Sequence, residues 1–273
     1  MSKYTKSSKG GKNNLTIALA VCAAVLLVLL VVLILLIPKK EEPAPTEPST
    51  EATEIETTTE ETTEPEETEP VMLEHMAALY ALNPDIIGWI RIEGTQLDYP
   101  VMFTPDDEQR YLHADFEGDY DLSGLPFIDK DCTMDPESQA LILYGHNMKN
   151  GTAFKALFGY EKAEFLEEHP TISFTTLYEE RTYEVLAMFY DEVYRKSDTC
   201  FKFYQFIDPE TEEEFNEGIQ YFKDHSILDT GVTAEYGDNL ITLVTCAYQK
   251  ANGRFVVVAR EVTEDTEIAK SVG

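Results

Sequence analysis

One uninterrupted apolar segment constrains this chain more than any other feature of its sequence. Residues 15–37, LTIALAVCAAVLLVLLVVLILLI, contain no charge in twenty-three positions. At ~1.5 Å of rise per residue, a helix of this length crosses a hydrocarbon core of ~30 Å. The segment therefore predicts a transmembrane helix. A cleaved signal peptide is the alternative, but its apolar region is typically only ~7–15 residues long and a convincing small-x-small site is missing after Ile37.

The charges that flank this segment predict its orientation. Four lysines precede it, whereas only Lys39 and Lys40 follow it. Because positive charge favours the cytoplasmic side, residues 1–14 are expected to form a short cytoplasmic tail. The chain would then be a single-pass protein of the cell membrane, with everything after the span outside the cell.

Composition divides the remainder into a stalk and a head. Residues 41–70 carry twelve glutamates and no basic residue, and are otherwise mostly threonine and proline. Such a segment cannot bury enough apolar area to offset its chain entropy, so 38–70 is interpreted as an acidic disordered stalk. Residues 71–273 have the length of one ordinary domain. The formal net charge of −30 excludes nucleic acid as a partner, because phosphate binding needs a basic surface.

The head reads as many short strands with few helical segments, which indicates a mostly β domain and a closed or nearly closed antiparallel barrel. A short helix is expected before Asn83-Pro84. A longer amphipathic helix is expected to follow, with Asp208 as its N-terminal cap and Pro209 at its first helical position. Its apolar residues Phe215 and Phe222 recur at helical spacing.

Two polar side chains with catalytic potential stand where apolar strands end. Cys246 ends the run NLITLVT, and His146 follows the run ALILY after a glycine. Arg254 opens the last strand. A free thiol has a pKa of ~8.5, so a nucleophilic cysteine needs a neighbouring cation or base. Taken alone, the three residues also fit a buried cysteine, a turn histidine and an edge arginine.

The motifs around these residues resemble the active-site signature of the sortases. TLVTC at 242–246 is followed by Arg254, and LYGHNMKNGTAF occupies 143–154. Residues 83–102, residues 115–129 and the helix inserted before the cysteine strand are similar to class B sortases. The resemblance covers most of residues 75–262.

The resemblance implies a closed barrel of about eight strands and an extracellular cysteine transpeptidase that needs no cofactor. By this resemblance, Cys246 would be the nucleophile and His146 the general acid and base. Arg254 would clamp the substrate and donate hydrogen bonds to the oxyanion. The backbone N–H of Ala247 would assist at the oxyanion. Tyr144 matches a position lining the substrate groove, although ordinary barrel packing explains it equally well. No cluster of coordinating side chains points to a metal site.

The family also implies the two substrates. A C-terminal sorting signal of a surface protein would be cut through a thioacyl enzyme, and its new carboxyl joined to an amine of a peptidoglycan cross-bridge or a pilin. Two alternatives stay open: a secreted thiol hydrolase or peptidase, and a non-enzymatic domain carried on a stalk. Cys132 and Cys200 lack a motif context, and the sequence leaves open whether they pair.

Overall fold

The computed structural model describes residues 70–263. The predicted tail 1–14, the predicted span 15–37 and all but the last residue of the predicted stalk 38–70 lie outside this range. Across residues 70–263, no helix is both long enough and apolar enough to cross a membrane.

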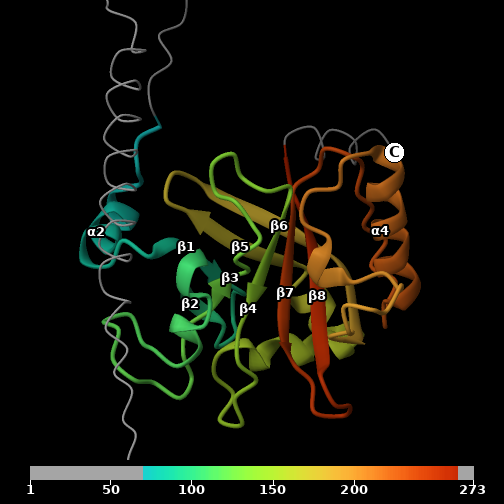
Figure 1. Cartoon of the computed structure of the whole chain (residues 1–273), viewed down its shortest axis with the longest axis horizontal. Helices are drawn as coiled ribbons and strands as arrows, with labels where there is room; N and C mark the ends of the chain where they lie inside the picture. Colours follow the sequence, from blue (N-terminus) through green and yellow to red (C-terminus); the bar gives the residue numbers. More distant parts are fainter. Residues whose placement is uncertain (1–69, 264–273) are drawn as a thin grey trace, which may run out of the picture. The chain divides into compact units, whose positions relative to one another are not determined.

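The domain is built around a closed barrel of eight strands (Figure 1). Around the barrel the strands follow the order β1-β2-β3-β4-β7-β8-β6-β5. Their bounds are β1 Ile86–Arg91, β2 Asp98–Met102, β3 Phe127–Ile128, β4 Ala140–Tyr144, β5 Thr171–Thr176, β6 Glu180–Glu192, β7 Leu240–Cys246 and β8 Gly253–Glu261. The closed, mostly β fold predicted from the sequence is thus confirmed.

Two neighbouring pairs correct the purely antiparallel arrangement that was expected. β2 pairs in parallel with β3, and β4 pairs in parallel with β7, so the barrel is mixed. Parallel neighbours require long crossovers, here residues 103–126 and 145–239, whereas antiparallel neighbours can be joined by tight turns. Turn signals in the sequence therefore predict the antiparallel hairpins but give no indication of which strands pair in parallel.

Short helices lie between the strands of the barrel or precede them. The α-helices are α2 Glu74–Leu82, α3 Ala163–Glu168 and α4 Glu212–His225, and the 3-10 segments are η1 Pro105–Asp107, η2 Arg110–Leu112, η3 Phe154–Glu161 and η4 Phe203–Gln205. The short helix before Asn83 and the long helix before the cysteine strand are both where the sequence predicted them.

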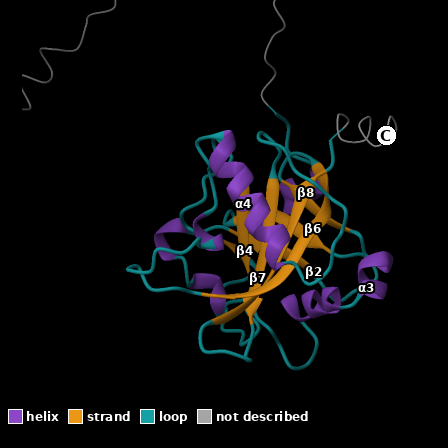
Figure 2. Ribbon diagram, turned by 90° about the vertical axis from the view of Figure 1, so that its right-hand side faces the viewer, coloured by secondary structure: helices purple, strands orange, loops and turns teal. Residues whose placement is uncertain are grey.

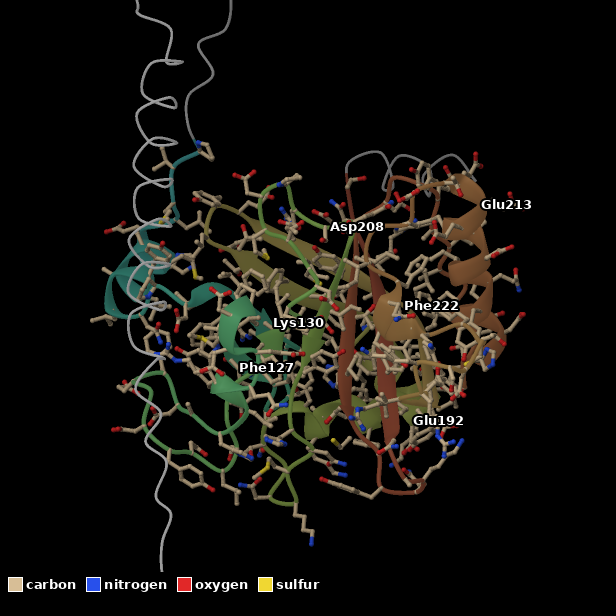
Figure 3. All side chains as sticks on the ribbon, viewed as in Figure 1. Phe127, Lys130, Glu192, Asp208, Glu213 and Phe222 are labelled. Atoms are coloured by element: carbon tan, nitrogen blue, oxygen red, sulfur yellow. The ribbon has the colours of Figure 1, made fainter. Side chains whose placement is uncertain are left out.

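Helix α4 packs against the outside of the barrel (Figure 2). Phe222 points from α4 towards the barrel, whereas Glu213 points to solvent (Figure 3). The Phe222 ring stacks on Phe189 of β6, with 5.6 Å between ring centroids. Because α4 covers β6 from outside, residues 185–189 are all buried and lose the alternation of a half-exposed strand. Burying one such phenylalanine contributes about 1.5–3 kcal/mol.

The cap of α4 differs from the expectation. Thr211 precedes the helix, and its hydroxyl accepts a hydrogen bond from the N–H of Glu214. Asp208 instead accepts hydrogen bonds from the Ser138 hydroxyl and the Gln139 N–H, at 2.9 and 2.8 Å. The carboxylate thus ties the approach to α4 to the start of β4, and the helix begins later in the chain.

Candidate active site

The parallel pairing of β4 and β7 brings the predicted histidine to the predicted cysteine. Tyr144 lies opposite Val244 at the ends of the two strands. The match continues beyond them, because the Gly145 N–H donates to the Val244 carbonyl at 3.1 Å and the Thr245 hydroxyl donates to the Gly145 carbonyl at 2.7 Å. His146 and Cys246 each lie two residues beyond the last paired positions, Tyr144 and Val244, and so lie at the same end of the two strands.

Antiparallel pairing of β7 with β8 supplies the third residue. Cys246 lies directly opposite Arg254, so their side chains stand on the same face of the sheet. The guanidinium donates to the carbonyl of Gly253 at 3.0 Å. Among the residues that the structure describes, Arg254 takes part in no salt bridge. Most of its donors therefore remain available to a ligand.

The turn between these two strands is tight. Gly253 donates its N–H to the Lys250 carbonyl at 3.1 Å and accepts from the Ala247 N–H at 2.9 Å. A Cβ at Gly253 would stand 2.6 Å from the Ala247 carbonyl oxygen, so this approach requires glycine. An ion pair of 2.6 Å between Lys250 and Glu192 ties the turn to β6. Short spacing in the sequence thus holds the thiol and the guanidinium in register.

A cavity of about 260 Å³ opens beside the thiol. It is lined by Glu108, Gln109, Leu112, Phe127, Tyr144, Gly145, His146, Val193, Phe203, Tyr204, Val244, Thr245, Cys246 and Arg254. The cysteine, histidine and arginine singled out in the sequence therefore share one cavity, and each is half-buried. Its wall is mostly apolar or aromatic, as expected of a site that holds an extended ligand.

The orientation of His146 depends on a segment that the sequence did not single out. Its Nε2 lies 2.8 Å from the carbonyl oxygen of Leu112. Because a carbonyl oxygen can only accept, Nε2 carries hydrogen and Nδ1 is the nitrogen left for proton exchange. The ring of His113 stacks on His146, with 5.2 Å between centroids and 19° between planes. No local pattern connects positions 112 and 113 with 146, because the tertiary fold alone brings them together.

Tyr144 meets both interpretations that the sequence left open. It lines the cavity, and its ring packs at 5.7 Å from that of Phe127, which Figure 3 labels. Its hydroxyl donates to Asp129 at 2.8 Å. Burial and the neighbouring carboxylate raise the pKa of Tyr144 well above its ordinary range, so the side chain acts as a neutral donor.

Ala247 is placed differently from the expectation. Its backbone N–H already donates to the Gly253 carbonyl. Ala247 does not line the cavity of about 260 Å³, but it lines a neighbouring hollow that Cys246 and Arg254 also border. A hydrogen bond of 2.9 Å occupies this donor because the turn after β7 is so short. In this conformation the N–H of residue 247 is not available to an oxyanion.

Cys132 and Cys200 do not form a disulfide with each other. Cys132 is buried, Cys200 is exposed, and both are free thiols, as is Cys246. Burial raises the pKa of Cys132 to about 12. Within residues 70–263, no group of three or more histidine, cysteine or acidic side chains could hold a metal ion.

Comparison with known proteins identifies the family of the chain. A family model described as the sortase domain matches residues 90–262. The chain belongs to the sortase family. Sortase B of Listeria monocytogenes is 31% identical over 193 residues, which are 70% of this chain and 75% of that protein. Sortase B of Staphylococcus aureus is 31% identical over 185 residues, or 67% and 72% of the two chains.

Solved sortase B structures share the fold. A Staphylococcus aureus sortase B–substrate complex is 29% identical, with a TM-score of 0.62 over 71% of this chain and 87% of that one. A sortase B complexed with triglycine is 30% identical, with a TM-score of 0.61 over 69% and 85%. The chain is thus a class B cysteine transpeptidase, and the non-enzymatic interpretation no longer applies.

Proposed function

We propose that Cys246, His146 and Arg254 carry out the transpeptidation, with a sorting-signal peptide as the first substrate and an amine as the second. The observation that supports this most is the convergence of the three side chains, from the ends of β7, β4 and β8, on one cavity. Of the three cysteines in the described range, Cys132 is buried in the core and Cys200 lies away from this cavity's lining.

The first half-reaction cleaves the peptide. The Cys246 thiolate attacks the threonyl carbonyl carbon, and the new oxyanion receives hydrogen bonds from Arg254. His146 then gives a proton from Nδ1 to the departing amine as the carbon–nitrogen bond breaks, which leaves a thioester on the enzyme. We assign the oxyanion to the guanidinium, because Ala247 would first have to release the Gly253 carbonyl.

The second half-reaction transfers the acyl group. An amine loses a proton to Nδ1 of His146, attacks the thioester carbonyl, and the thiolate of Cys246 leaves. Relatives solved with a substrate and with triglycine support a peptide and an amine as the two ligands. We assign the amine to a peptidoglycan cross-bridge or a pilin lysine. Tyr144, on the cavity wall, is assigned to contact the peptide.

The proposed setting is the outer face of the cell membrane. The apolar run 15–37 would anchor the chain, and the acidic stretch 38–70 would hold the catalytic domain at a distance from the lipid. This setting would place the enzyme among its wall and surface-protein substrates. The proposed reaction involves neither nucleic acid nor a cofactor.

A ligation assay tests the proposed function. A library of sorting-signal peptides is incubated with the enzyme, with and without an added amine, and products are identified by mass spectrometry. Ligated product that depends on the amine supports transpeptidation, whereas free acid alone at saturating amine would indicate a thiol hydrolase. Cys246→Ala removes the nucleophile and is expected to abolish turnover while the melting temperature stays unchanged. Turnover by this variant would refute the assignment.

A further inference from the structure

The imidazole of His146 is oriented from outside the three-residue site. The χ2 torsion of a histidine is broad and roughly two-fold, so the ring plane must be fixed by contacts. Two of these contacts come from consecutive residues: the Leu112 carbonyl accepts from Nε2, and the His113 ring stacks on the imidazole face. The hydrogen bond to Leu112 fixes the tautomer of His146, and the stacked ring of His113 fixes the plane of the imidazole.

The segment that provides these contacts is itself firmly held. Tyr111, directly before Leu112, is fully buried, and its hydroxyl donates to Asp85 at 2.8 Å and accepts from Asn83 at 2.8 Å. On the other side, the His113 carbonyl accepts from the Asp121 N–H at 3.1 Å. Hydrogen bonds on both sides therefore hold the stretch that carries the stacked ring, one set next to the start of β1 and the other within the loop between β2 and β3.

His113 itself stays outside the substrate cavity. It is exposed to solvent and is not among the residues lining the cavity, whereas Leu112 and His146 are. The charged side chains that line this cavity with His146 are Glu108 and Arg254. His113 can therefore influence the reaction through the imidazole it touches, without lining the cavity itself.

We infer that His113 is a positioning residue, whose ring holds the plane of the His146 imidazole so that Nδ1 can exchange protons in the cavity that His146 shares with Cys246. This inference rests on the proposed role of His146 and adds a residue to it. Proton delivery to the leaving amine would be less well aligned without the stacked ring, so the loss should appear in kcat. Because His113 does not line the cavity, KM for the peptide should stay constant.

Two substitutions of the same residue in the full-length enzyme separate stacking from other roles. His113→Ala removes the ring, and we expect kcat to fall on the order of 10-fold with KM unchanged. His113→Phe keeps a flat ring without titratable nitrogens, and we expect it to restore kcat to within about twofold of wild type. His75→Ala, an exposed histidine on α2, serves as the control and should have no effect.

The outcomes are distinct. Wild-type kcat in His113→Ala would overturn the inference, as would a rise in KM at constant kcat. Equal losses in the alanine and phenylalanine variants, with melting temperatures unchanged, would also overturn it, because stacking would then not be the cause. If His113→Ala fails to fold, rescue by His113→Phe still decides the matter. Turnover by Cys246→Ala would instead refute the proposed function, independently of His113.

Discussion

At Arg254 the charge and the shape of the side chain can be tested separately. The guanidinium stands opposite Cys246 with most of its donors unbonded. Lysine keeps the positive charge but replaces a planar fork of donors with a single ammonium. If Arg254 clamps the peptide and the oxyanion, Arg254→Lys should lower kcat/KM on the order of 10²-fold, equivalent to ~2.7 kcal/mol. Steady-state kinetics on a sorting-signal peptide measures this loss.

The matched control is Arg195→Lys, at an exposed position outside the cavity lining. It should retain wild-type kinetics. Near wild-type activity in Arg254→Lys, with an unchanged melting temperature, would show that charge alone suffices and would remove the oxyanion role.

The three thiols of the described range should differ in reactivity. Burial raises the pKa of Cys132 to about 12, so this residue is a thiol at neutral pH, and the surrounding core also shields it from reagents. Alkylation of the folded enzyme at neutral pH should modify Cys246 and the exposed Cys200, and spare Cys132. Mass mapping of the peptides that contain these residues measures the result. Modification of Cys132 as fast as Cys200 would contradict the buried position, and full modification after denaturation is the control.

Strand ends drew attention to His146, Cys246 and Arg254, because each stands next to an apolar run, but the resemblance to the sortases was needed to choose a catalytic role over ordinary structural ones. The contacts that orient them were not predictable. A backbone carbonyl at Leu112 has no sequence signature, and His113 lies in an acidic loop whose proximity to His146 only the fold creates. The same applies to Ala247, whose N–H is occupied because of the turn geometry.

At the scale of elements, the turn from β7 to β8 sets the distance between thiol and guanidinium. In Gly253→Ala the added methyl would stand 2.6 Å from the Ala247 carbonyl oxygen and 3.0 Å from that of Lys250. Because both are backbone atoms, the turn must shift, and we expect a loss of about 1–3 kcal/mol in the free energy of unfolding. kcat/KM should fall as well, since Cys246 and Arg254 flank the turn.

Chemical denaturation and peptide kinetics measure the two effects. Ala251→Ser, at an exposed position of the same turn, is the control and should change neither. A Gly253→Ala enzyme with wild-type stability and kinetics would mean that the turn does not determine the geometry of the site.

The helix α4 offers a prediction in which stability and activity separate. Thr211 caps the helix through its hydroxyl and is not among the residues lining the cavity. Thr211→Ala should lower the free energy of unfolding by ~1 kcal/mol and leave kcat/KM unchanged. Denaturant titration measures the loss, with Thr233→Ala in an exposed loop as the control. Equal stability of the two variants would contradict the assigned cap.

Element identity was largely predictable, because β-branched runs and helical spacing are local signals. The start of α4 was not, since Asp208 has the right chemistry for a cap but its carboxylate binds Ser138 and Gln139 instead. The parallel pair of β4 and β7 was equally hidden, although it is the pairing that brings His146 to Cys246. Local sequence thus predicts the elements, and long-range pairing creates the site.

For the whole molecule, the proposed topology has a direct test in intact protoplasts. Residues 41–70 carry twelve glutamates, so a glutamate-specific protease added outside should cut the proposed stalk. The catalytic domain should resist longer, because its backbone is held in a closed barrel, and should appear in the supernatant as an active fragment. An epitope placed in residues 1–14 should stay protected until the membrane is permeabilised, because the flanking lysines favour a cytoplasmic tail. A domain that is cut only after permeabilisation would reverse the proposed orientation and separate the enzyme from the proposed wall substrates.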